Sequence, residues 1–463
     1  MAASEAWLAP ALDYIDAWLG FQMRASEQPG CLFAVAFDGE VVSELALGAA
    51  DLRTGEALTP RHRFRVASHS KSFTAAGLMK LREAGKLKLD DRAGQYVEGL
   101  HPALAAATIA QLLSHTAGIL RDGPRPEYWV DRKPFLDAPS LRAELKAPPA
   151  IEPALRLKYS NHGFGLAGLV IEVVTGEPYR DFIEREVVAA AGLAETTADG
   201  PPAPGTPFAR GHSGKALMGR RIVFPGDQPT NALAPATGFV STAGDLARFF
   251  SRLSPKAGTS FLSAESRREM SRAQWTDPWS AAPLRYGLGT ISGVYDGWDW
   301  FGHSGGFLGY VSRTAVVPDQ RLAVSCLANS ADGWAQGWSD GALSILKRFA
   351  EGGAPETRLA DWRGRWWSPW GPSDLVPIGG KVVVAMPGLP TPLQKVTELT
   401  VEAPDRARIS EAGGFASFGE RAELIRGADG SVEAVSLGGS RLVKEADLVA
   451  ELTGRYEAPA AAT

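Results

Sequence analysis

A serine and a lysine, Ser68 and Lys71, stand three positions apart in the segment SHSK. On a helix, residues at this spacing share a face and lie about 5–6 Å apart at their Cβ atoms. A serine hydroxyl becomes a good nucleophile when a base takes its proton, and a lysine can be that base only when its pKa is lowered. The pair predicts nucleophilic catalysis, although a helix-capping serine beside a solvated lysine has the same spacing.

A second group of polar residues, Tyr159-Ser160-Asn161, precedes the glycine-rich segment HGFGLAGLVIEVVTG, which is predicted to be a helix. A tyrosine can serve as a general acid or base when a nearby lysine lowers its pKa. The amide of Asn161 is suited to holding an amide of the substrate. The alternative for this group is an ordinary helix N-cap, where Ser and Asn are common.

The third group is His303-Ser304-Gly305-Gly306, which leads into the predicted strand FLGYVSRTAVV. Glycines at such a position let a substrate backbone approach the edge of a sheet and pair with it. A plain glycine loop is the alternative for these residues when they are taken alone.

The elements that must position these groups are predicted from hydrophobic patterning. Residues 68–84 indicate a helix that Gly85 can cap, and Asp38-Gly39 between two apolar runs indicates a β-hairpin. Helical patches broken by proline-rich loops occupy residues from about 100 to 230, and strands return over residues 285–330. Strands at both ends of a helical middle predict an α+β fold, in which one antiparallel sheet is flanked by helices and accompanied by a helical subdomain.

Beyond residue 355 the pattern changes to short alternating runs such as KVVVAM and VTELTVEA. Such runs are typical of a small antiparallel β barrel or sandwich. We therefore expect a first domain over residues 1–352, with the helical subdomain at about 100–230, and a β-rich domain over residues 355–463.

Composition excludes several classes of protein. The 463 residues carry a formal net charge of −4 and no Lys/Arg run, which argues against nucleic-acid binding. No stretch of about 18 apolar residues occurs and the N-terminal segment does not resemble a signal peptide, so we expect no membrane span and a cytoplasmic location. The only cysteines, Cys31 and Cys326, lie in apolar runs, and no His/Cys cluster accompanies them. We expect two buried thiols, no metal and no cofactor.

The order S-x-x-K, then Y-S-N, then H-S-G resembles the penicillin-recognising serine enzymes. These include class C β-lactamases, D-alanyl-D-alanine carboxypeptidases, D-aminopeptidases and family VIII esterases. The segments LLSHTAGI, PATGFVSTAGDLARF and YGLG also look like this family, and the resemblance covers about residues 10–350. The C-terminal part is similar to the lipocalin-like domains appended to some D-aminopeptidases.

The resemblance implies a role for each residue of the three groups. Ser68 would be acylated, Lys71 would help to deprotonate it, and Tyr159 would carry the proton to the leaving group and activate the deacylating water. Asn161 would hold the acyl amide, and the backbone N–H groups of Ser68 and Gly306 would form the oxyanion hole. Ser304 and Gly305 would line the substrate strand.

His303 stands where many members of the family have lysine. A histidine with a pKa near 6.5 is mostly neutral at pH 7, so the anchoring of a substrate carboxylate at this position stays open.

The sequence therefore predicts a serine hydrolase that cleaves amides or esters, foremost a peptidase or amidase acting on small peptides or amides that contain D-residues. A carboxylesterase or β-lactamase of the same fold is the first alternative. A β-lactam- or peptide-binding sensor without turnover, and an acyltransferase, are the others. The expected partner is a small-molecule or short-peptide substrate, and assembly into a homo-oligomer stays open.

Overall fold

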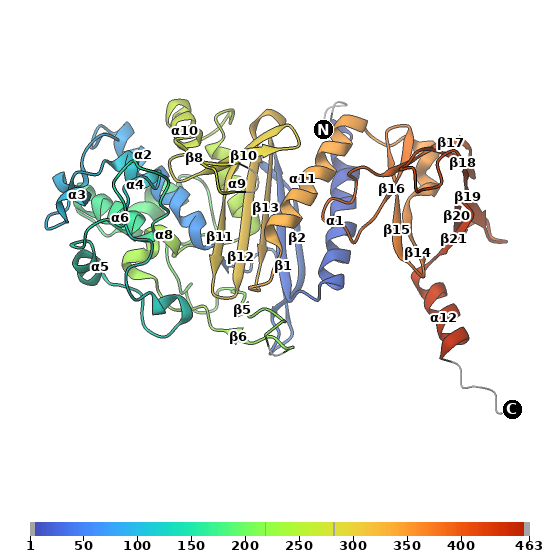
Figure 1. Cartoon of the computed structure of the whole chain (residues 1–463), viewed down its shortest axis with the longest axis horizontal. Helices are drawn as coiled ribbons and strands as arrows, with labels where there is room; N and C mark the ends of the chain where they lie inside the picture. Colours follow the sequence, from blue (N-terminus) through green and yellow to red (C-terminus); the bar gives the residue numbers. More distant parts are fainter. Residues whose placement is uncertain (1–4, 218, 281–282, 458–463) are drawn as a thin grey trace. The chain divides into compact units, whose positions relative to one another are not determined.

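The computed structural model describes residues 5–217, 219–280 and 283–457, and its helices and strands are labelled in Figure 1. The chain divides into two compact units, one of residues 27–339 and one formed by residues 1–26 together with 340–463. The boundary falls inside helix α11 (Ala335–Gly352). The amphipathic N-terminal helix α1 (Leu8–Ala25) thus groups with the C-terminal segment, which the local sequence pattern did not indicate.

The larger unit is built on one antiparallel sheet with the strand order β3-β2-β1-β13-β12-β11-β10-β9-β8. As the sequence predicted, strands from the first and last parts of this unit join in one sheet. Strand β1 pairs with β13, and Phe33 lies opposite Cys326. The strands are β1 (Gly30–Phe37), β2 (Glu40–Asp51), β3 (Glu56–Ala57), β8 (Trp275–Asp277), β9 (Leu284–Tyr286), β10 (Ile291–Tyr295), β11 (Trp298–Phe307), β12 (Tyr310–Val317) and β13 (Leu322–Ala328).

Local residue choice explains the centre of this sheet. Asp38 and Gly39 both have positive φ, at 53° and 87°, which forms the two-residue turn predicted between β1 and β2. Almost all residues of strands β1 and β13 are buried, which explains why both strands are nearly continuous apolar runs in the sequence. Helix α9 (Ala243–Leu253) contacts both strands and covers one face of the sheet.

The remaining helices of this unit are mostly short and include the predicted helical subdomain. Helix α2 is the central one, because it contacts α6 and α8 and is buried from Ser70 to Met79. The 3₁₀ turn η2 (Ala67–His69) precedes it and contacts β11. The helices are α2 (Ser70–Glu83), α3 (Pro102–Ala105), α4 (Ile109–Leu113), α5 (Ala138–Glu144), α6 (Asn161–Thr175), α7 (Tyr179–Ile183), α8 (Ala234–Thr237) and α10 (Ala264–Ser271).

Four short strands complete the larger unit. Strand β4 (Phe64–Arg65) pairs with β7 (Val240–Ser241) just before η2, and β5 (Gly211–His212) pairs with β6 (Val223–Phe224). The pairing of β4 with β7 anchors the chain directly in front of Ser68.

The eight strands of the C-terminal segment close into an antiparallel barrel, which decides between the barrel and the sandwich that the sequence left open. Trp366, Leu399 and Ile409 are buried in a common core with other apolar side chains, as the alternating pattern predicted. The strands are β14 (Gly364–Ser368), β15 (Gly371–Ile378), β16 (Lys381–Ala385), β17 (Thr397–Ala403), β18 (Arg406–Glu411), β19 (Arg421–Arg426), β20 (Val432–Leu437) and β21 (Ser440–Val443), followed by helix α12 (Glu445–Tyr456). No helix in the described ranges is long and apolar enough to cross a membrane.

Candidate active site

Ser68 lies in the 3₁₀ turn η2, two residues before α2 begins, so the helix predicted to start at Ser68 starts at Ser70 instead. Every residue from Phe64 to Met79 is buried except Ser68, which is partly exposed. Ala67 has a φ of +49°, a conformation that L-residues adopt rarely. The Ser70 hydroxyl donates to the Ala67 carbonyl at 2.6 Å and stabilises this turn, which presents the Ser68 hydroxyl at the surface of an otherwise buried segment.

Lys71 is fully buried, and its Nζ atom has three oxygen neighbours. These are Asn161 Oδ1 at 2.7 Å, the Ala236 carbonyl at 2.8 Å and Ser68 Oγ at 3.1 Å. The amide and carbonyl oxygens can only accept, so two N–H groups of the amine are directed at Asn161 and Ala236. The remaining tetrahedral position of Nζ faces Ser68, where a neutral lysine presents its lone pair.

The electrostatic environment favours that neutral form. Burial lowers the pKa of Lys71 well below its usual value. The negative charge of Asp122 opposes this shift, and the positive charge of Arg121 adds to it. A lysine in this state can accept the proton of the Ser68 hydroxyl.

Tyr159 approaches Ser68 from the other side, and its hydroxyl donates to Ser68 Oγ at 2.7 Å. A role as general acid or base depends on the pKa of the Tyr159 hydroxyl. Burial raises this pKa above its usual value, and the hydrogen bond to Ser68 offsets only part of the effect. Tyr159 is therefore a protonated donor at neutral pH.

Asn161 is engaged at both ends of its amide group. Its Oδ1 accepts from Lys71, and its Nδ2 donates to Asp122 Oδ1 at 2.6 Å. The same Asp122 oxygen accepts from Trp129 Nε1 at 2.9 Å, and the other oxygen pairs with Arg121 at 3.2 Å. In this arrangement Asn161 orients the lysine, whereas the sequence suggested contact with a substrate amide. Asp122 was not identified from the sequence, although only Arg121 separates it from the segment SHTAGIL.

His303, Ser304, Gly305 and Gly306 lie near the end of strand β11, and the strand predicted to follow them is β12, which begins at Tyr310. Pairing of β10 with β11 ends at Gly302, so the edge of β11 beyond that residue is not paired with β10. The opposite edge continues to pair with β12. A free edge of this kind can accept an extended substrate backbone.

Gly305 is required by the close approach of β11 to the turn that carries Ser68. A Cβ atom at Gly305 would lie 2.2 Å from the Val66 carbonyl oxygen and 2.6 Å from Ser312 Oγ. A Cβ atom at Gly306 would meet nothing within 4 Å, because this position faces open space. A side chain is thus excluded at Gly305 by close contacts, whereas the space at Gly306 is open.

The His303 ring is buried and neutral. Its Nε2 lies 3.0 Å from the Tyr286 hydroxyl, and its Nδ1 lies 2.7 Å from the Ser304 carbonyl oxygen. Burial lowers the pKa of His303 well below its usual value, and the neighbouring His69 and Lys71 lower it further. His303 consequently supplies no fixed positive charge at neutral pH.

A second histidine, His115, packs against the tyrosine of the site, with its ring centroid 4.1 Å from that of Tyr159. Its Nδ1 accepts from the Ser160 N–H at 3.1 Å, and burial lowers its pKa well below the usual value. These contacts give His115 a structural role behind Tyr159.

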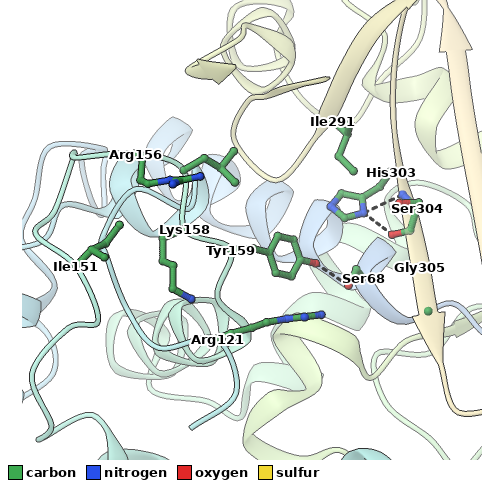
Figure 2. A pocket seen from close by; sticks show the side chains of 12 residues that line it. Ser68, Arg121, Ile151, Arg156, Lys158, Tyr159, Ile291, His303, Ser304 and Gly305 are labelled. Carbon is green, nitrogen blue, oxygen red and sulfur yellow. Dashed lines mark hydrogen bonds between the residues drawn. The ribbon is translucent and has the colours of Figure 1, made fainter. Parts of the chain in front are cut away.

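Ser68, Tyr159 and the end of strand β11 line a cavity of about 560 Å³, and Figure 2 shows Ser68 and Tyr159 meeting in it. Lys71 and Asn161 lie behind Ser68 and do not line the cavity. Sequence reasoning did not single out several of the lining residues, which lie on loops without a recognisable motif. The lining residues are Ser68, Arg121, Ile151, Arg156, Leu157, Lys158, Tyr159, Ile291, His303, Ser304, Gly305 and Gly306. The described residues contain no His/Cys/Asp/Glu group that could hold a metal ion.

The fold and this cavity define a class of protein, the serine hydrolases of the β-lactamase fold. Residues 15–341 match the Beta-lactamase family, and the chain belongs to this family.

Individual proteins show the same relationship. The chain is 29% identical over 316 residues to penicillin-binding protein 4 of Amycolatopsis lactamdurans, covering 65% of this chain and 81% of that protein. It is 28% identical over 360 residues to a D-aminopeptidase of Brucella anthropi, covering 74% of this chain and 63% of the relative. The structure of the octameric penicillin-binding protein homologue from Pyrococcus abyssi superposes with a TM-score of 0.64 at 23% identity, over 93% of this chain and 99% of that one, and shares its fold.

Proposed function

We propose that the protein hydrolyses amide bonds of small peptides or peptide-like compounds through an acyl-enzyme on Ser68. One observation carries the proposal. The Ser68 hydroxyl, at the edge of the cavity, has a buried lysine 3.1 Å away and a protonated tyrosine 2.7 Å away. Acyl transfer to a serine needs a base that takes the proton of the hydroxyl and an acid that protonates the leaving group.

In the acylation step, the neutral amine of Lys71 takes the proton of Ser68, and the oxygen attacks the substrate carbonyl carbon. The backbone N–H groups of Ser68 and Gly306 stabilise the oxyanion of the tetrahedral intermediate. The Tyr159 hydroxyl then protonates the leaving nitrogen as the C–N bond breaks. The Lys71 ammonium returns a proton to Tyr159, whose ring centroid lies 4.6 Å from Nζ.

In the deacylation step, a water molecule attacks the ester carbon while the neutral amine of Lys71 accepts its proton. The C–O bond to Ser68 breaks, Ser68 recovers a proton, and a carboxylic acid leaves. Asn161 takes no proton in this scheme. Its hydrogen bonds to Lys71 and Asp122 position the amine.

Substrates with D-residues are the finer part of the proposal. The similarity to a D-aminopeptidase and the free edge of β11 support a short peptide or amino-acid amide as the acyl donor. Ester hydrolysis by the same site would follow the same two steps with an easier leaving group.

Intact-mass analysis tests the proposal with a panel of D- and L-amino-acid p-nitroanilides, p-nitrophenyl esters and penicillins. We expect turnover of the anilides, with a transient acyl adduct on Ser68 that is absent in Ser68→Ala. Thermal melting of Ser68→Ala should match the wild type, because one partly exposed hydroxyl is removed. Turnover of esters alone would favour an esterase, and a stable penicillin adduct without turnover would favour a sensor. Undiminished activity of folded Ser68→Ala would refute the mechanism.

A further inference from the structure

The cavity beside Ser68 has an uneven distribution of charge. Three of its lining residues, Arg121, Arg156 and Lys158, are cationic, and no carboxylate is among them. We call these three residues the cationic wall. Figure 2 shows them on the Tyr159 side of the cavity, with His303 and Ser304 on the other side. The chain as a whole has a formal net charge of −4, so this concentration of positive charge does not follow from a basic composition.

The charges of the cationic wall are largely uncompensated by the protein. Arg156 and Lys158 form no ion pair with any residue in the described ranges, and Arg156 instead lies 6.0 Å from the ring centroid of Trp279. Arg121 pairs with Asp122, whose oxygens also serve Asn161. The Arg121 side chain is 67% exposed and keeps most of its donors for a ligand.

The opposite side of the cavity does not share this charge. Burial keeps His303 neutral, and its neighbours in β11 are a serine and two glycines. A substrate lying along β11 therefore has a neutral strand on one side and the cationic wall on the other. A free α-ammonium group near this wall would be repelled, whereas a carboxylate would be attracted.

We propose that the cationic wall binds a carboxylate of the substrate, so that the enzyme prefers anionic amides to amides with a free ammonium group. This inference rests on the proposed amide hydrolysis at Ser68. The cationic wall consists of Arg121 and of two residues on the loop that leads into Tyr159. It is separate from the His303 position in β11. The carboxylate can belong to the acyl part or to the leaving group, and the experiment separates the two.

Four p-nitroanilide substrates test the preference. N-succinyl-D-alanine p-nitroanilide carries a carboxylate in the acyl part, and N-acetyl-D-alanine 3-carboxy-4-nitroanilide carries it in the leaving group. N-acetyl-D-alanine p-nitroanilide is neutral, and D-alanine p-nitroanilide carries an ammonium group. We expect kcat/KM for one of the anionic substrates to exceed the neutral one by roughly tenfold, with the ammonium substrate slowest. The preference should shrink as salt rises from about 20 mM to about 500 mM, because the wall is exposed to solvent.

Charge reversal identifies the residues. Arg156→Glu combined with Lys158→Glu should lower the anionic-to-neutral ratio of kcat/KM by roughly tenfold or more. The matched control is Lys146→Glu, an exposed lysine of the same unit that does not line the cavity, and its ratio should equal that of the wild type. Thermal melting of all variants separates misfolding from altered preference.

Two outcomes would overturn the inference. One is a wild-type enzyme that turns over the neutral or ammonium substrate as fast as both anionic ones, in a reaction that needs Ser68. This result would leave the proposed amide hydrolysis intact. The other is an anionic preference that the double variant retains. If no substrate reacts, labelling by neutral and carboxylate-bearing fluorophosphonates decides: equal rates at Ser68 refute the cationic wall, and no labelling of Ser68 refutes both proposals.

Discussion

Replacement of Tyr159 by phenylalanine removes a single hydroxyl that donates to Ser68 Oγ at 2.7 Å. Because burial raises the pKa of Tyr159, this hydroxyl is protonated at neutral pH and available to the leaving group. Loss of a general acid lowers the rate by about 10²–10⁴, or about 3–5 kcal/mol in the barrier. This cost applies to an amide, whose nitrogen must leave protonated. A p-nitrophenolate leaves without a proton, so its rate should fall by less than about tenfold.

The assay compares the p-nitroanilide and the p-nitrophenyl ester of one N-acylated D-amino acid in stopped-flow acylation experiments. The ratio of amide to ester acylation rates should fall by at least about tenfold in Tyr159→Phe. Tyr310→Phe is the matched control. Its buried hydroxyl donates to the Ala209 carbonyl at 2.8 Å, outside the cavity, so its loss should cost about 1 kcal/mol of stability and leave the ratio unchanged. Equal losses on the two substrates would refute proton donation to the leaving group and would assign Tyr159 to the positioning of Ser68.

Three further predictions concern the residues around this site. The pKa of His303 lies well below its usual value, so this ring carries no charge that could be lost between about pH 6 and 8. KM for an anionic substrate should therefore not rise over this range because of His303. Profiles of KM against pH for the wild type and His303→Gln check this. Gly305→Ala should lower the free energy of unfolding by about 1–3 kcal/mol because its Cβ would meet the Val66 carbonyl, whereas Gly306→Ala should melt with the wild type. The buried His69 has a pKa lowered to about 3, so below its unfolded value of about 6.5 the unfolded state binds more protons and stability falls as pH falls. The loss of folding free energy approaches about 2 kcal/mol at pH 5. In urea denaturation, the free energy of unfolding should depend less on pH in His69→Asn than in the wild type. Equal pH dependence in the two proteins would assign the effect to other groups.

Features that depend on neighbouring residues were predictable from the sequence. The hairpin at Asp38-Gly39 formed because both turn residues tolerate positive φ. The sheet assembled from both ends of the first unit followed from apolar runs at the start and the end of that region. Ser68, Tyr159 and the four residues of β11 line one cavity, as their order along the chain indicated.

Features that depend on loops and on distant partners were not predictable. Asp122 holds the amide of Asn161, and Ala236 supplies the carbonyl that fixes the amine of Lys71, although neither position belongs to a motif that was singled out for chemistry. Arg121, Arg156 and Lys158 are cations on irregular segments, where no periodicity shows which way a side chain points. Their convergence on the cavity requires the folded chain.

By itself, the sequence determined the residue types of the site, their order and the antiparallel framework that holds them. The tertiary structure alone decided the protonation states, because desolvation depends on how completely a group is enclosed by parts of the chain far away in sequence. For this reason the pKa of Lys71 lies well below its usual value, which favours the proposed role as a base. Burial likewise makes Tyr159 a proton donor and leaves His303 without a charge.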